Sequence, residues 1–79
     1  MDKYQLQARE LRRLNGMTAK YHGYQYRLTY AGGPGCYVRI DRRQIGTRNY
    51  KHFLNVSCYE DHYWDTAHAR CLIAIKKGV

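Results

Sequence analysis

The chain has 79 residues, with 14 Lys and Arg against six Asp and Glu, and therefore a net charge of +8 at pH 7. This length allows a single domain over residues 1–79, since typical domains hold about 100–150 residues. A hydrophobic content of 44% excludes a disordered tail. No apolar run reaches the roughly 20 residues of a membrane span, and Met1-Asp2-Lys3 is polar rather than a leader, so we expect a cytoplasmic domain.

Three cysteines, Cys36, Cys58 and Cys71, bear on the redox compartment. An odd number argues against the disulfide framework of a small secreted protein, so we expect reduced thiols. Cys71 lies in an apolar helical pattern and is expected in the core, because a thiol packs as a small hydrophobic group.

Residues 2–15 are predicted to form a helix. Asp2 is the expected N-cap, and Asn15-Gly16 is the expected end, because both of these residues adopt a left-handed backbone easily. Apolar residues recur every three or four positions and form one stripe: Tyr4, Ala8, Leu11 and Leu14.

Residues 24–30 and 36–41 are predicted to form the two strands of a hairpin. Both segments alternate apolar and polar residues, which indicates strands with one buried face. Residues 31–35 contain three glycines and a proline, and they are predicted to be the turn. The expected inward side chains are Tyr24, Tyr26, Leu28, Tyr30, Val38 and Ile40, and the expected outward ones are Gln25, Arg27, Thr29, Tyr37, Arg39 and Asp41.

A third strand is predicted over residues 50–56. The second strand extends at most to Ile45, with residues 46–49 as the turn between the two. Phe53 and Val56 break the alternation of the third strand, so we expect a bulge or an early end.

After a loop over residues 57–62, a second helix is predicted from about Asp61 to Lys77. Either Asp61 or Asp65 is the expected N-cap. Lys76-Lys77-Gly78 is a favourable end, because the cations lie at the negative end of the helix dipole and glycine follows them. The apolar face of this helix consists of Trp64, Ala67, Cys71, Ala74 and Ile75.

This order of elements predicts an α+β domain of type α-β-β-β-α. We expect a three-stranded antiparallel sheet packed on the C-terminal helix and flanked by the N-terminal one. Three strands need a helix on one face to be stable alone, and the C-terminal helix supplies it.

The outward side of this sheet is basic and polar, and it is the candidate binding surface. Nine of the 14 cations are arginine, which binds phosphate in a fork and reads base edges. Tyrosine stacks on bases, and a β-sheet can enter the major groove of DNA. We therefore interpret the chain as a non-enzymatic nucleic-acid-binding protein, with DNA as the favoured ligand. The expected contacts are Arg27, Tyr37 and Arg39 on the sheet, and Arg42, Arg43, Arg48 and Lys51 in or beside the turn after the second strand.

From Tyr24 to Lys77, the order of three strands and a helix resembles the small DNA-binding domains of plant ethylene-responsive factors and the related arm-binding domains of phage integrases. The residues that carry the resemblance are Phe53-Leu54-Asn55-Val56-Ser57, Tyr59, and the helical alanines Ala67, Ala69 and Ala74. In that family the sheet lies in the major groove, so the resemblance implies that Arg27 and Arg39 read DNA.

The order α-β-β-β-α is also similar to that of the double-stranded-RNA-binding domain. Gly33-Pro34 between the first two strands looks like the Gly-Pro loop of that domain. This resemblance implies RNA as the alternative nucleic acid.

A second class of function fits the same composition. Small single domains of this size are found among phage-encoded inhibitors of bacterial defence, including anti-CRISPR proteins. Tyrosine and arginine are enriched at protein-binding hot spots, and a charge of +8 favours an acidic surface of a protein or ribonucleoprotein partner. A homodimer formed through the nine tyrosines is a further alternative.

Cys58, His62, His68 and Cys71 are all possible zinc ligands, in the pattern Cys-x3-His-x5-His-x2-Cys. This is not a usual finger spacing. The alternative is that Cys71 is a core residue, that Cys58 ends a strand, and that both histidines lie at the surface. Asp65 and His68 are spaced as a pair, but no nucleophile is placed beside them, so we expect neither catalysis nor a cofactor.

Overall fold

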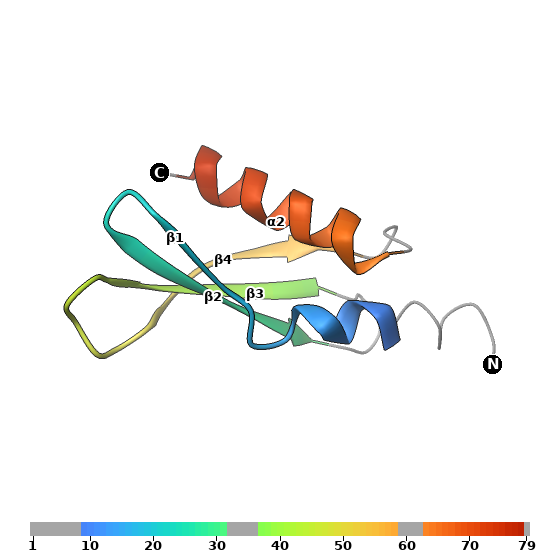
Figure 1. Cartoon of the computed structure of the whole chain (residues 1–79), viewed down its shortest axis with the longest axis horizontal. Coiled ribbons are helices and arrows are strands. Elements are labelled where there is room, and N and C mark those ends of the chain that lie inside the picture. Colours follow the sequence, from blue (N-terminus) through green and yellow to red (C-terminus); the bar gives the residue numbers. More distant parts are fainter. Residues whose placement is uncertain (1–8, 32–36, 59–62, 79) are drawn as a thin grey trace.

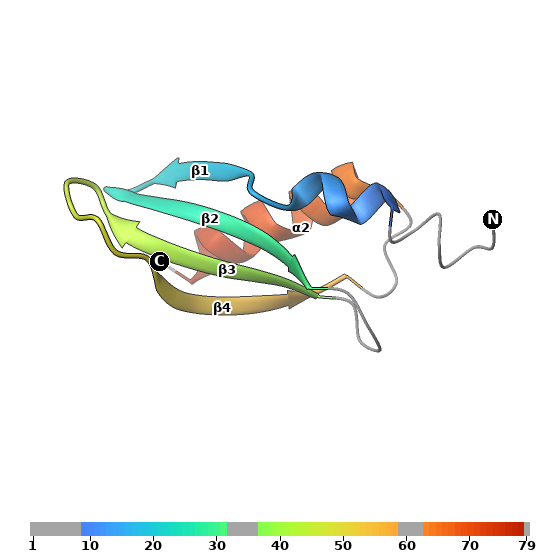
Figure 2. The ribbon, with the colours of Figure 1, turned by 90° about the horizontal axis from the view of Figure 1, so that it is seen from below.

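The computed structural model describes residues 9–31, 37–58 and 63–78. They form a four-stranded antiparallel sheet in the order β1-β2-β3-β4, with a C-terminal helix, α2 (Trp64–Lys77), across one face (Figures 1 and 2). The predicted α+β class is confirmed. The prediction of three strands is wrong, because β1 (Thr18–Tyr21) adds a fourth.

The first helix agrees with its prediction over the described residues. Residues 9–11 are helical and continue into a short 3-10 helix, η1 (Arg12–Leu14). Leu11 and Leu14 are fully buried, which confirms the C-terminal half of the predicted apolar stripe. Asp2, Tyr4 and Ala8 lie outside the described residues.

The missed strand β1 is joined to β2 (Tyr24–Ala31) by a two-residue turn. Tyr21 pairs with Tyr24, and the residues between them, His22 and Gly23, have φ values of 48° and 80°. Positive φ at both central residues is the geometry of a type I′ hairpin turn, whose twist matches that of the flanking strands. The pair His22-Gly23 between two tyrosines is therefore the sequence signal that could have indicated a hairpin, and with it the strand β1.

The other two strands are β3 (Tyr37–Gln44) and β4 (Lys51–Ser57), and both lie close to their predicted ranges. The predicted hairpin turn at residues 31–35 falls almost wholly outside the described residues. β3 continues to Gln44, which pairs with Tyr24, so Arg42 and Arg43 lie in the last part of the strand, within its predicted limit at Ile45. The chain then turns at Gly46, where φ is 99° and Thr47 N–H donates to the Gln44 carbonyl over 3.0 Å.

Of the two alternatives predicted for the third strand, a bulge or an early end, β4 shows the bulge. Ile40 pairs with Leu54, but Asp41 pairs with His52, so Phe53 is an extra residue in β4. Phe53 and Leu54 both pack against the core. The bulge thus places two successive apolar side chains on the same side of the sheet.

The helix α2 packs against β4 and η1 with Ala67, Cys71 and Ile75 buried. Its end is as predicted, with Gly78 N–H donating to the Ala74 carbonyl over 3.0 Å. The prediction that Asp65 is the N-cap is wrong. The cap residue is Tyr63, which makes no side-chain cap bond, and Asp65 lies inside the first turn. Asp61 lies outside the described residues.

One core joins the sheet to the helices. It contains Leu11, Leu14, Tyr26, Leu28, Val38, Ile40, Val56, Cys58, Ala67, Cys71 and Ile75. Figure 2 shows α2 behind the sheet, and no described helix crosses the opposite face. Among the described residues, no helix has the length and apolar character that crossing a membrane requires.

Candidate nucleic-acid interface

The sheet face that points away from α2 is the candidate interface, and we call it the outer face. Side chains alternate along a strand, so the neighbours of the buried Tyr26, Leu28, Val38 and Ile40 point to this face. The strand pairing aligns them in rows: Lys20, Gln25 and Arg43; Thr18, Arg27, Asp41 and His52; Thr29, Arg39 and Asn55; Tyr37 and Ser57.

Asp41 lies at the centre of the outer face and is only 6% exposed. It was predicted to point outward, and it does lie on this face, where two arginines cover it. Arg39 Nε donates to Asp41 Oδ1 over 2.9 Å, and Arg27 Nη2 lies 3.8 Å from Oδ2. The side chains of Arg27 and Arg39 remain 45% and 53% exposed, so Asp41 holds them in place while leaving them open to a ligand.

Tyr50 supports two arginines from the loop before β4. Its ring centroid lies 4.3 Å from Arg27 Cζ and 5.0 Å from Arg43 Cζ. Arg43 also donates through Nη2 to Gln25 Oε1 over 2.7 Å and through Nη1 to the Thr47 carbonyl over 3.3 Å. Arginines held in this way lose less side-chain entropy when they bind an anion.

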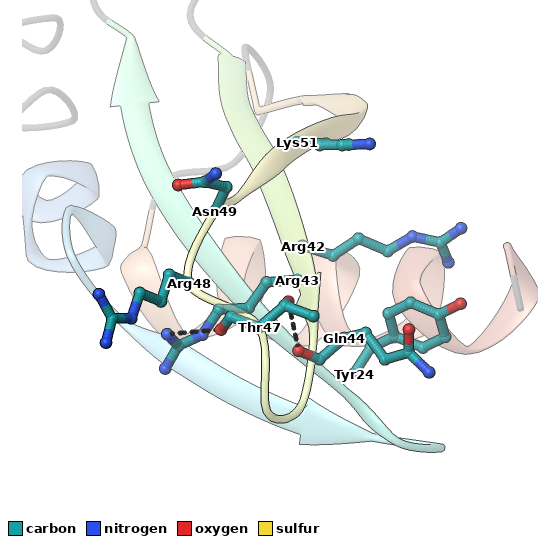
Figure 3. Close-up of a pocket in the computed structure, with 8 residues that line it drawn as sticks. All are labelled: Tyr24, Arg42, Arg43, Gln44, Thr47, Arg48, Asn49 and Lys51. Atoms are coloured by element: carbon teal, nitrogen blue, oxygen red, sulfur yellow. Dashed lines mark hydrogen bonds between the residues drawn. The ribbon is translucent and has the colours of Figure 1, made fainter.

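An open pocket of about 460 Å³ surrounds the connection between β3 and β4 (Figure 3). In this view Arg43 and Arg48 extend to one side of the connection, and Arg42 and Lys51 extend to the other. Its lining consists of Tyr24, Arg42, Arg43, Gln44, Thr47, Arg48, Asn49 and Lys51.

The structure divides the predicted contact set between two sides of the sheet. Arg42 pairs with Lys51 on the side of α2, and its Cζ lies 4.4 Å from the ring centroids of both Tyr24 and Phe53. Arg48 lies in the connection between the strands. The remaining predicted contacts share the outer face: Arg27, Tyr37, Arg39 and Arg43.

Sequence reasoning missed the supporting residues. Tyr50 was assigned to a strand with no role, and Asp41 was given no partner. His52 and Asn55 were not singled out, although the expected bulge was the signal that both lie on the outer face.

The possible zinc ligands do not form a site in the described part of the chain. Cys58 and Cys71 are core residues, and the Cys58 thiol donates to the Val56 carbonyl over 3.6 Å. His68 stacks on Trp64, with ring centroids 6.2 Å apart, and His62 is outside the described residues. No three His, Cys, Asp or Glu residues gather among those described in the way a metal ion needs.

Comparisons with protein-family models, with curated proteins and with solved structures return no match. The resemblances to ethylene-responsive factors, phage integrases and the double-stranded-RNA-binding domain stay predictions.

Proposed function

We propose that this protein binds nucleic acid, with DNA as the favoured ligand, through the outer face of its sheet and without catalysing a reaction. The observation that carries the proposal is the set of three arginines, Arg27, Arg39 and Arg43, held by Asp41 and Tyr50 on a face that no described helix covers. Such a set of arginines provides forked donors to phosphate at positions that are set before the ligand arrives. A cytoplasmic location is part of the proposal.

Lys20 is a further cation on the outer face and is exposed, and Arg48 extends toward the side of Arg43 in Figure 3. Among the described residues, Asp41 is the one acid on this face, and two of the arginines already partner it. The excess charge is therefore positive, which complements a phosphate backbone.

The first test measures the affinity of the protein for random-sequence duplex DNA, single-stranded DNA and duplex RNA at ~50 and ~150 mM salt. We expect micromolar or tighter binding that persists at the higher salt, with a preference among the three. Loss of all binding at the higher salt would overturn the proposal and favour an acidic protein surface as the partner, as the inhibitor interpretation requires.

A pair of matched variants tests the surface itself. Arg39→Gln/Arg43→Gln removes two charges from the outer face and leaves Arg27 to partner Asp41. Lys76→Gln/Lys77→Gln removes the same charge from the end of α2, on the other side of the sheet. We expect roughly a tenfold or greater loss of affinity for the first variant and a much smaller loss for the second. Equal losses would show that overall charge, rather than the outer face, governs binding.

A further inference from the structure

The bulge in β4 brings two polar side chains to the same side of one strand. In a regular strand, residues three positions apart face opposite sides of the sheet. Because Phe53 is an extra residue, both His52 and Asn55 lie on the outer face, with His52 Nε2 and Asn55 Oδ1 3.0 Å apart. Bulges occur often beside functional sites, and here the extra residue keeps His52 and Asn55 on one face although they are three positions apart in the sequence.

This pair borders a hollow on the outer face. β3 contributes Tyr37 and Arg39, and the four side chains line an open space of about 350 Å³. The space is shallow and open to solvent, so it can seat one small planar group against the sheet without enclosing it. Tyr37 is 38% exposed, and Arg39 lies directly opposite Asn55 in the strand pairing.

The lining has the chemistry of nucleobase recognition. Tyr37 offers an aromatic ring for stacking. Arg39 donates to Asp41 through Nε, and a guanidinium carries further N–H donors for a ligand. When His52 donates from Nε2 to Asn55 Oδ1, the amide NH₂ of Asn55 is left to donate to a base edge.

We propose that this hollow binds one unstacked base of a single-stranded nucleic acid. A duplex keeps its bases stacked inside and presents only their edges in the grooves, whereas a single strand can turn a base into a hollow. The inference rests on the proposed function, in which Arg27 and Arg43 contact the backbone phosphates. The hollow then binds one base of the same strand.

The test compares three labelled probes by fluorescence anisotropy at ~150 mM salt. They are an oligothymidine of about 12 nucleotides, the same strand with an abasic site at every position, and a duplex of equal length. The abasic strand keeps every phosphate and lacks only the bases. We expect the intact strand to bind roughly tenfold tighter than either of the others, because stacking of a base on an aromatic ring contributes only where the base is present and free to unstack.

Two variants test whether the contribution of the bases to affinity comes from this hollow. Tyr37→Leu and Asn55→Ala are expected to weaken binding of the intact strand by roughly fivefold to tenfold and to leave binding of the abasic strand unchanged. Tyr63→Leu is the matched control, because Tyr63 is 65% exposed and lies at the start of α2. Thermal unfolding of each variant verifies that it is folded.

The outcomes separate the two proposals. Equal affinity for the intact and abasic strands, or tighter binding of the duplex, would overturn the base site and leave phosphate binding standing. Binding of none of the three probes would overturn both.

Discussion

At the scale of single residues, Asp41 organises the outer face. Its carboxylate is buried between Arg27 and Arg39, both of which stay about half exposed. We expect Asp41→Asn to lower the free energy of unfolding by about 1 kcal/mol, because a charged acceptor becomes a neutral one and the two arginines repel each other. Urea unfolding measures this change as a lower midpoint with an unchanged slope.

Glu10→Gln is the control for Asp41→Asn. Glu10 forms an exposed pair with Arg13 at 3.5 Å, so removing its charge should change stability by only about 0.3 kcal/mol. If the two variants are equally stable, Asp41 does not hold the arginines in the way the structure indicates.

The sequence predicts only the part of the candidate site that lies where apolar and polar residues alternate clearly along a strand. Arg27 and Arg39 lie within clear alternating segments, and both were placed on the correct side. Arg42 and Arg43 follow them in a polar run where the sequence leaves the end of the strand open, up to Ile45, and pairing with β2 shows that the strand continues to Gln44. Arg42 therefore lies on the side of α2, between two aromatic rings that sequence spacing does not bring together.

At the scale of elements, the turn between β1 and β2 depends on Gly23. Its φ of 80° is in the left-handed region, and a Cβ added there would meet no atom within 4 Å. The effect of Gly23→Ala is therefore backbone strain alone, and we expect a loss of about 1 kcal/mol of stability. His22→Asn, by contrast, should leave stability equal or higher, because Asn-Gly is a favoured pair for this turn. Thermal unfolding of both variants tests the turn, and a neutral Gly23→Ala would contradict its assignment.

The same strand shows why the fold was predicted incompletely. Segments with seven or eight residues carry enough alternation to be recognised, as in β2 and β3. β1 has only four residues, Thr18–Tyr21, and its one position opposite the buried Tyr26 is the small Ala19. Such a strand is specified by its turn and its partner strand rather than by its own pattern.

At the scale of the whole molecule, the described residues form one sheet with helix on one of its sides. A chain of this size buries only about 60% of its extended surface, so its stability is small and sensitive to ligands. A ligand at ~100 times its Kd should add about 2.7 kcal/mol, which corresponds to a rise of roughly 10–20 °C in Tm.

Calorimetry with and without an oligonucleotide checks this rise. The Arg39→Gln/Arg43→Gln variant should show a much smaller increase in Tm at the same ligand concentration. Equal increases in the variant and the native chain would place the binding surface elsewhere.

The bulge in β4 also has a consequence for evolutionary change. Phe53 is in effect a one-residue insertion, and its consequences differ between the two sides of the sheet. On the outer side, His52 and Asn55 keep the partners they would have in an uninterrupted ladder, Asp41 and Arg39. On the inner side, the inserted ring packs against Tyr26 and the end of α2 at Gly78. Gain or loss of this one codon would alter the core while preserving the order of polar groups on the binding surface, so the two faces of β4 can change independently.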